Sequence, residues 1–590
     1  MTRNAEGSRS MFDSRNEATV DMVKPKPVRF PFSTENAVQT VVFLIVALLV
    51  FAPLIYLLIG SFSTAVLGAP GATFTLQNWL TVYTTPTYVG AFVNTIALAF
   101  VVSVASLVIG TTMAWIVART DAPGRGILAL LVVIPLMLSN TITTLAWIAL
   151  AAPNAGFINA ATRALFGINT VFDIYSFAGI ALVLVTSYAS FAFVSMYAAL
   201  RSIDGSLEEA SYMAGAGALQ TGIRMTLPLV WPSLVASFLI IFVMTAENFS
   251  VPTLLGAAFN FQTLPSRIYI DMTVDPSKPT LAAAAGTMLL WIAVVGTYWQ
   301  RRIIARAKNY VTVSGKGSRP RLTALSRVGK LWASGVLVMF VLIAVVIPYC
   351  ALVLGSFLSF LTPRLSPKVF TLDNYSRLFT LEVYTAITNS LMFSVLGGLG
   401  LTLFYLLVAY CIKRSYGISG KIVDYVVLVP TAIPALALGL GILWTFVGLP
   451  LPIYGTAAIL IIAYLARNIG YGVGQSRVAL VQVSDELTEA AQMSGATPLR
   501  ALRDVTVPIL QPALLALWTM LLMHIFTEVS MTILLYNYNT VTLPVALWND
   551  MASGHQTRAF AIAVLQAVII FIIIFAANWR WGILKNTLER

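Results

Sequence analysis

Residues 201–232 read RSIDGSLEEASYMAGAGALQTGIRMTLPLVWP, and this polar segment separates two long apolar runs. Inside a bilayer every backbone polar group needs a partner within the protein, and irregular polar backbone has none when it faces hydrocarbon. We therefore expect this segment in water, between two membrane-spanning helices.

The same segment contains signals for two short helices. Ser206 and Glu209 have the spacing of a capping box, in which a serine hydroxyl and a glutamate carboxylate bind backbone amides at a helix start. Gly215 and Gly217 relax the backbone after the first helix, and Pro228 is expected to end the second. The sequence predicts a short helix, a bend and a second short helix, which together form a compact docking element.

A second copy of this element lies further along the chain, at a constant offset in residue number. Glu209-Ala210-Ser211, Gly215, Pro228 and Pro232 recur as Glu489-Ala490-Ala491, Gly495, Pro508 and Pro512. The pattern of Glu-Ala-Ala, three residues, Gly, nine residues, Ile, one residue and Leu-Pro resembles the cytoplasmic signature of the membrane subunits of bacterial ATP-driven importers. Ser211, Met225, Val505 and Val507 depart from that signature but nearly conserve its side-chain volumes.

The resemblance implies that each loop, 201–232 and 481–512, forms a coupling helix that sits in a cleft of an ATPase subunit. The alternative is an ordinary interfacial helical hairpin, which does not explain the duplication. The residues assigned to ATPase coupling are Glu209, Ala210, Gly215, Pro228, Glu489, Ala490, Ala491, Gly495 and Pro508.

The composition is that of a membrane protein. Of the 590 residues, 58% are apolar and 10% are charged, and the mean hydropathy is +0.85. Soluble proteins carry about 25% charged residues. The formal net charge of +13 comes from basic residues in the short connections between apolar runs, which favours the positive-inside pattern over nucleic-acid binding. Cys350 and Cys411 fall near opposite membrane faces, so no disulfide is expected.

Twelve apolar runs are long enough to span a bilayer. The first starts near Val41, and the others lie near residues 92–117, 127–151, 177–200, 234–255, 281–299, 331–354, 386–412, 423–447, 457–480, 512–535 and 559–579. With residues 1–38 as a cytoplasmic tail, the inside loops hold 27 of the Lys and Arg residues and the outside loops hold 7. This asymmetry predicts a multi-pass protein of the bacterial inner membrane, with both docking loops and both termini in the cytoplasm.

The duplication extends beyond the docking loops. Gly60-Ser61-Phe62 recurs as Gly355-Ser356-Phe357. The sequence predicts an all-α polytopic membrane protein built from two tandem six-helix permease units, residues 39–300 and 331–590, in parallel repeat. Residues 301–330 between them hold nine Lys or Arg and no acidic residue, which predicts a solvated cytoplasmic linker that also contacts lipid head groups.

The sequence contains no motif for catalysis. Gly315-Lys316 lacks the earlier glycine and the following Ser or Thr of a phosphate-binding loop. ATP and magnesium are therefore assigned to the partner ATPase, and no cofactor is assigned to this chain. His524 and His555 have no metal-ligand spacing with the cysteines, so no metal site is expected. With no nucleophile elbow and no paired catalytic acids on one loop, the chain is not expected to be an enzyme.

Ionisable residues at membrane depth are costly and often functional. Glu247 and Asn248 in the fifth span and Glu528 in the eleventh occupy nearly equivalent places, since Ser250 and Ser530 are related by the same offset as the docking loops. These five residues are candidates for the border of a translocation path where the two halves meet. Capping of helix ends, or internal pairing that fixes the packing, explains them equally well.

The tenth span carries three further polar residues, Arg467, Asn468 and Arg477. They either line a wet cavity or extend their polar ends toward the membrane surface. The structural role is the favoured interpretation.

Other residues are similar to fused permeases of the ferric-iron importer type. Pro135, Trp147 and the segments 153–159 and 173–176 resemble the first half of such permeases, and Thr527–Thr532 resembles the second, with Thr527 and Val529 in place of Lys and Leu. The resemblance implies two ATPase subunits below the membrane, a periplasmic binding protein above it and ferric iron as the cargo. Permeases for 2-aminoethylphosphonate, polyamine, thiamine and sulfate share the architecture and remain alternatives.

A secondary transporter is the alternative of another class, because such proteins can also have twelve spans in parallel repeats. A proton-driven carrier has no need of a duplicated cytoplasmic Glu-Ala-Ala element. This element favours the ATP-driven importer, whose halves rock between inward-facing and outward-facing states.

Overall fold

The computed structural model describes residues 34–66, 69–167, 172–203, 205–307, 322–362, 364, 366–415, 418–449 and 451–581. Within these residues helices are the regular secondary structure and β-structure is limited to three isolated bridges, which confirms the all-α class. The helices of the first half are α1 Thr34–Ser61, α2 Gln77–Thr84, α3 Pro86–Arg119, α4 Arg125–Met137, α5 Asn140–Ala151, α6 Phe157–Phe166, α7 Phe177–Arg201, α8 Gly205–Met213, α9 Ala218–Thr221, α10 Leu227–Ala246, α11 Ser250–Gly256, α12 Leu264–Thr273 and α13 Pro279–Ala307. Those of the second half are α14 Arg327–Val341, α15 Ile347–Ser356, α16 Asp373–Ser376, α17 Leu381–Met392, α18 Gly398–Arg414, α19 Ile418–Val426, α20 Ala435–Gly448, α21 Ala457–Val481, α22 Asp485–Met493, α23 Pro498–Ala501, α24 Val507–Phe526, α25 Thr532–Leu535, α26 Leu543–Ala552 and α27 Gln556–Trp581.

Ten helical runs in the described residues are long and apolar enough to cross a membrane, and two further pairs of helices qualify only as bent pairs. These pairs are α4 with α5, bent by 101°, and residues 418–432 with α20, bent by 110°. The spans predicted over 127–151 and 423–447 are therefore each present as a bent pair of helices and not as one continuous helix. Ser139 caps α5 by accepting a hydrogen bond from the Ile142 amide, and Pro434 precedes α20, so the chain turns at both places.

Four predicted boundaries also need correction. The helices α10 and α24 end at Ala246 and Phe526, so the runs expected to reach 255 and 535 are interrupted before the short helices α11 and α25. The helix α1 already begins at Thr34 and α13 extends to Ala307, so the adjoining ends of the predicted tail and linker are helical. The rest of the tail and residues 308–321 of the linker lie outside the described residues.

Three prolines follow π-helical turns instead of ending helices. The turns Gly222–Thr226, Leu342–Val346 and Leu502–Thr506 directly precede the helices that carry Pro228, Pro348 and Pro508. Proline has no N–H, and its ring clashes with the carbonyl four residues earlier in a regular helix. A wider turn displaces that carbonyl, so the helix continues through the proline. The prediction that Pro228 ends a short helix is therefore wrong.

The two halves interlock. The helix α1 of the first half packs on α20 of the second, and α15 of the second half packs on α5 of the first. The contact between α1 and α20 is close, because a Cβ on Gly441 would lie 2.4 Å from the Pro53 carbonyl oxygen. One continuous buried core runs through both halves.

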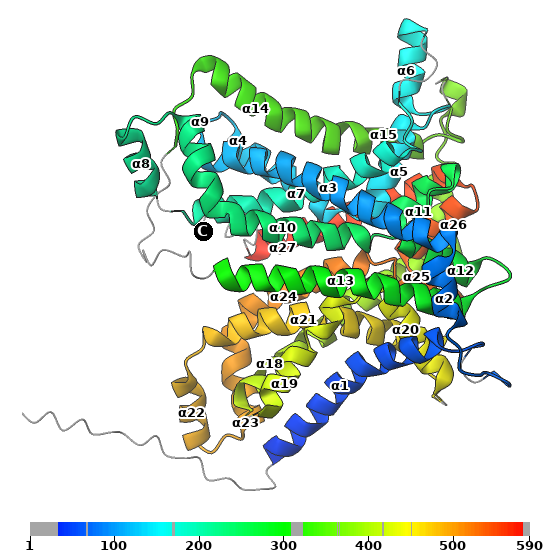
Figure 1. The fold of residues 1–590 in the computed structure, drawn as a ribbon, viewed down its shortest axis with the longest axis vertical. Coiled ribbons are helices and arrows are strands. Elements are labelled where there is room, and N and C mark those ends of the chain that lie inside the picture. Colours follow the sequence, from blue (N-terminus) through cyan, green and yellow to red (C-terminus); the bar gives the residue numbers. More distant parts are fainter. Residues whose placement is uncertain are drawn as a thin grey trace, which may run out of the picture.

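Figure 1 shows how the duplicated elements are placed. The short helices α8 and α22 lie at the same end of the molecule, on opposite sides. The elements α11, α12, α25 and α26 gather at the other end. The two halves therefore run in the same direction, as a parallel repeat requires.

Candidate functional site

A polar cavity of about 300 Å³ lies where the two halves meet. Its walls come from places where helices are interrupted, namely the α4–α5 bend, the α10–α11 break and the α24–α25 break, together with α21. Interrupted backbone is tolerated at membrane depth where it lines a polar space. Glu247, Asn248, Ser250, Glu528 and Ser530, the five candidates from the sequence, all line this cavity.

One ion pair crosses the cavity from half to half. Arg467 on α21 donates to the Glu247 carboxylate at 2.9 Å, with side chains 24% and 20% exposed. The same guanidinium donates to the Ile433 carbonyl at 2.8 Å, in the bend before α20. Arg467 therefore lines the cavity and also fixes the packing of the two halves.

Asn248 and Glu528 are equivalent residues that cap equivalent short helices. The Val251 amide donates to Asn248 Oδ1 at 3.2 Å at the start of α11. The Met531 and Thr532 amides each donate to Glu528 at 3.1 Å before α25. Both residues lie in breaks between helices, whereas the sequence placed them within spans. They cap helices, which is one of the two explanations offered for them, and they also line the cavity, so their place on a translocation path stays a prediction.

Sequence reasoning missed Tyr188 as part of this wall. Its hydroxyl accepts hydrogen bonds from Asn248 at 3.1 Å and Asn140 at 3.3 Å, and donates to the Met244 carbonyl at 3.2 Å. Asn468 occupies the equivalent place in the second half, where its Oδ1 lies 3.5 Å from Nδ1 of His524. The offset that relates the two docking loops also relates Tyr188 to Asn468, and this was the available signal.

Three aromatic rings form a cluster beside this cavity, next to or on α11, α12 and α26 at the end of the molecule opposite the docking helices (Figure 1). Phe249 lines the cavity and packs against Tyr269 and Trp548, with ring centroids 4.9 and 4.6 Å away. The Trp548 indole donates to the Tyr269 hydroxyl at 3.0 Å, so this cluster also joins the two halves. Phe249 and Trp548 are buried.

At the opposite end, α8 and α22 present the residues assigned to ATPase coupling. Glu209, Ala210, Glu489 and Ala490 are exposed, and Ala491 is partly exposed. Gly215 and Gly495 have φ of +85° and +91°, a left-handed conformation that glycine adopts without strain. These values confirm the predicted bend.

The cap of α8 differs from the prediction. This helix begins at Gly205, so Ser206 lies inside its first turn and does not precede it. In the second copy Ser484 caps α22 by accepting from the Glu486 amide at 3.3 Å.

Two exposed methionines at the ends of the docking helices were also missed. Met213 and Met493 are 89% and 90% exposed and lie at equivalent positions. Methionine adapts its shape to a partner surface, and a large apolar side chain exposed at the same place in both copies indicates a contact. Their recurrence at the repeat offset was the available signal.

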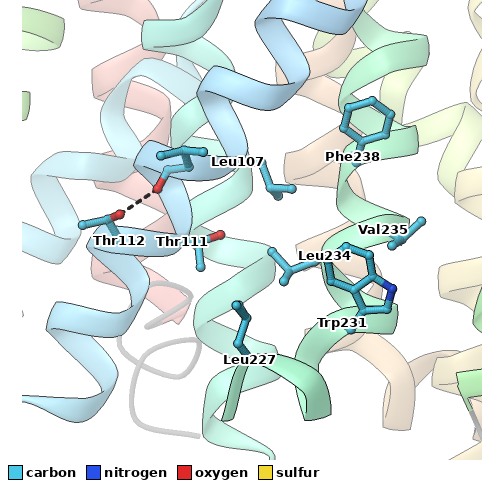
Figure 2. Close-up of a pocket in the computed structure, with 9 residues that line it drawn as sticks. Leu107, Thr111, Thr112, Leu227, Trp231, Leu234, Val235 and Phe238 are labelled. Atoms are coloured by element: carbon cyan, nitrogen blue, oxygen red, sulfur yellow. Dashed lines mark hydrogen bonds between the residues drawn. The ribbon is translucent and has the colours of Figure 1, made fainter. Parts of the chain in front are cut away.

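A larger cavity, of about 510 Å³, is not part of this site. It is an apolar groove between α3 and α10, and Figure 2 shows Leu107 on one side and Leu227, Trp231 and Phe238 on the other. The groove lies within two membrane spans. Its wall is mainly apolar, which suits lipid chains better than a polar cargo.

Two other features considered from the sequence lie away from the polar cavity. Arg477 forms an ion pair with Asp424 and does not line the cavity. Cys350 is exposed and Cys411 is buried. Among the described residues, no group of three or more His, Cys, Asp or Glu residues is placed to hold a metal ion.

Apolar spans repeated around a polar cavity, with two exposed docking helices at one end, define a polytopic transport protein. The family described as binding-protein-dependent transport system inner membrane component matches residues 106–309 and again 406–579. The chain belongs to this family and carries its characteristic unit twice.

Curated relatives extend over most of the chain. It is 26% identical to the ferric transport system permease protein FbpB of Actinobacillus pleuropneumoniae, over 83% of this chain and 71% of that protein. It is 27% identical to the putative ferric transport system permease protein FbpB 1 of Haemophilus influenzae, over 80% and 74%. It is 29% identical to the putative 2-aminoethylphosphonate transport system permease protein PhnV of Salmonella typhimurium, over 38% and 84%.

Among solved structures, the chain is similar to a bacterial ABC transporter involved in the import of the acidic polysaccharide alginate. The identity is 20%, the TM-score is 0.37, and the match covers 44% of this chain and 91% of that chain.

Proposed function

We propose that this chain is the permease of an ATP-driven importer that passes ferric iron from a periplasmic binding protein into the cytoplasm. The two ferric permease relatives match 83% and 80% of it, whereas the phosphonate relative matches 38%. One chain supplies both membrane halves. Two ATPase subunits dock on α8 and α22 and hold ATP with magnesium, and both termini lie in the cytoplasm.

The observation that carries the proposal is the polar cavity crossed by the ion pair of Glu247 and Arg467. Charged groups at membrane depth are rare and mark ion or substrate paths. Glu247 is paired with Arg467, whereas the Glu528 carboxylate accepts hydrogen bonds from two backbone amides and the Thr532 hydroxyl and has no ion-pair partner among the described residues. A cation gains from that charge, and the hydroxyl and amide oxygens of Ser250, Ser530 and Asn248 supply hard ligands of the kind such a cation prefers.

The cavity is also better suited to the passage of an ion than to its permanent binding. A transported ion must bind weakly enough to leave, and the described residues hold no group of three or more His, Cys, Asp or Glu side chains placed to hold a metal ion. The iron is therefore a cargo of this site and not a resident metal.

The same geometry supports alternating access. The rings of Phe249, Tyr269 and Trp548 form a cluster beside the cavity, at the end of the molecule opposite the docking helices. Closure of the ATPase dimer would move α8 and α22 together, and the halves would rock until the aromatic cluster parts. Both contacts join the two halves, so both must change in each transport cycle.

The first test is Glu528→Gln. At about 8 Å and an effective dielectric of about 20, one charge contributes about 2 kcal/mol for each unit of cation charge. We expect radioactive iron uptake to fall roughly tenfold or more at equal membrane abundance, in cells that also express the binding protein and ATPase.

Asp424→Asn is the matched control, because it removes a carboxylate whose half-exposed ion pair lies outside the cavity and is worth little. Unchanged uptake in Glu528→Gln would show that Glu528 is not part of the translocation path. Iron uptake without any ATPase would overturn the importer function.

A further inference from the structure

The two docking loops share their backbone, but a buried glutamate of the first has no counterpart in the second. In the first half, Arg119 at the end of α3 forms an ion pair with Glu208 of α8 at 3.3 Å, with side chains 2% and 8% exposed. The Thr226 hydroxyl donates to the same carboxylate at 3.1 Å. Arg119 also donates to the Leu200 carbonyl at 2.7 Å. A buried carboxylate with a cation and a hydroxyl as partners therefore holds the first docking helix in place.

In the second half a threonine takes the place of this carboxylate. The residues equivalent to Arg119, Glu208 and Thr226 are Arg414, Thr488 and Thr506, because α18 ends where α3 does and the docking loops align at their constant offset. Thr506 is 2% exposed, and among the described residues its hydroxyl has no hydrogen-bond partner. Leaving a buried hydroxyl unpaired is costly, which points to a partner that comes from outside the chain.

A cavity of about 170 Å³ occupies the place of the missing carboxylate. Thr506, Thr488, Arg414 and Lys413 line it, together with Asp485 and Glu489. Lys413 already pairs with Asp485 at 2.6 Å and reaches the Leu480 carbonyl at 3.5 Å. The volume is several times the roughly 30 Å³ share of one water molecule, so the end of an acidic side chain fits.

We propose that this second docking cavity receives an aspartate or glutamate side chain of the ATPase subunit bound at α22. The first half shows which group this arrangement of cation and threonine binds, because Glu208 fills the equivalent place there. The inference rests on the proposed function, which puts an ATPase at each docking loop. Two identical ATPase subunits then meet unequal sites, one filled by the permease itself and one open to the partner.

The test compares Thr488→Glu with Thr488→Gln in the full-length permease. Glutamate supplies the carboxylate internally, as Glu208 does, and repels the incoming one, whereas glutamine fills the same volume without charge. Affinity for the purified ATPase is measured by titration in nanodiscs of zwitterionic lipid. We expect Thr488→Glu to weaken binding roughly tenfold or more relative to Thr488→Gln, since a hydrogen bond to a charged group is lost.

Thr506→Val tests the same contact from the other side, because it removes the hydroxyl and nearly keeps the volume. We expect it to weaken ATPase binding several-fold. Thermal unfolding of each variant reports whether the docking loop still folds. A double-mutant cycle with Asp→Asn and Glu→Gln changes on the ATPase surface identifies the acid, which is the one coupled to Thr506→Val.

Equal affinities of Thr488→Glu and Thr488→Gln would overturn the inference. So would a difference that appears only when anionic lipid or inorganic phosphate is added, because the anion would then be a lipid head group or a free ion. Failure of the wild-type permease to bind any ATPase would contradict the proposed function instead, so the two failures are distinguishable.

Discussion

Acidic residues buried at the outer end of the protein each have close partners. Asp271 on α12 is 2% exposed, accepts from the Tyr88 hydroxyl at 2.8 Å and pairs with Arg267. Asp550 on α26 is 4% exposed and pairs with Arg558. A buried charge is tolerated only when it is paired and hydrogen-bonded, so these contacts allow the short outer helices to pack against the membrane core.

A single carboxylate also anchors the C-terminal part of the linker, and its contribution depends on pH. Asp121 accepts hydrogen bonds from Lys330 at 2.7 Å and from the Leu325 amide at 2.9 Å, and these hold the pKa of the Asp121 carboxyl below its ordinary 3.8. A lowered folded-state pKa means that the contact stabilises above that ordinary value and is lost as pH falls through the folded-state value. We expect residues 322–330 to lose protection from hydrogen exchange below about pH 4 in the wild type.

Asp121→Asn should show weaker protection that no longer changes over this acid range. Asp373→Asn, at an exposed residue of α16, serves as the control and should behave as the wild type. The same acid transition in Asp121→Asn and the wild type would show that another group is responsible.

At the scale of helices, each docking element combines a short exposed helix, a glycine bend and a π-helical turn. The bend sets α8 and α22 apart from the spans, and the wide turn lets α10 and α24 continue past a proline. Each docking helix is thereby connected through a continuous helix to the cavity, because Glu247 follows α10 and Glu528 follows α24 within two residues. If the docking helices couple to an ATPase as proposed, their movement would reach the cavity along α10 and α24.

The coupling role of these helices is tested by Glu209→Arg combined with Glu489→Arg. The helix dipole alone favours a carboxylate near a helix start by about 0.3–1 kcal/mol, so folding should survive. Reversal of charge at a desolvated contact costs several kcal/mol, and we expect loss of ATPase binding or hydrolysis uncoupled from uptake, with each single change milder.

Glu382→Arg is a matched control, since Glu382 is an exposed acid in the first turn of α17 on the opposite side of the membrane. Abundance in the membrane should be equal for all variants. Wild-type uptake by the double variant would show that these loops are not the coupling element.

At the scale of the whole molecule, the first helix of each half packs against the other half. The helices α1 and α15 cross over, so neither six-helix unit is complete by itself. Close glycine contacts such as Gly441 against Pro53 make this exchange specific, because a larger side chain would separate the helices.

This exchange predicts the behaviour of a chain divided between Ser314 and Gly315. Residues 1–314 and 315–590 should assemble into a transport-competent complex when expressed together, and each should be degraded when expressed alone, because α1 or α15 then lacks its partner. Affinity purification through one fragment measures the association.

Deletion of residues 34–61 from the first fragment provides the control and should abolish co-purification. Accumulation of either fragment alone as a monodisperse species would show that the units are independent.

The sequence by itself determined the helical class, the duplication and the docking loops. Hydrophobic length, the constant repeat offset and the glycine at each bend are properties of the chain itself, and residues 215 and 495 behave as their patterns indicate. It also selected the five polar residues of the cavity, because charge at membrane depth is unusual wherever it occurs.

Only the tertiary structure decided how these parts meet. The bends of the third and ninth spans, the partner of Glu247, the aromatic cluster and the exchange of α1 and α15 all depend on contacts between residues distant in sequence. Thr488 shows most clearly what the sequence alone leaves undecided. It stands where the first half has a buried glutamate, and this difference has a consequence only because Arg414 and Thr506 are folded around the position. Local patterns determine which helices form, whereas the packing of long-range neighbours determines which polar groups are satisfied within the chain and which need a partner.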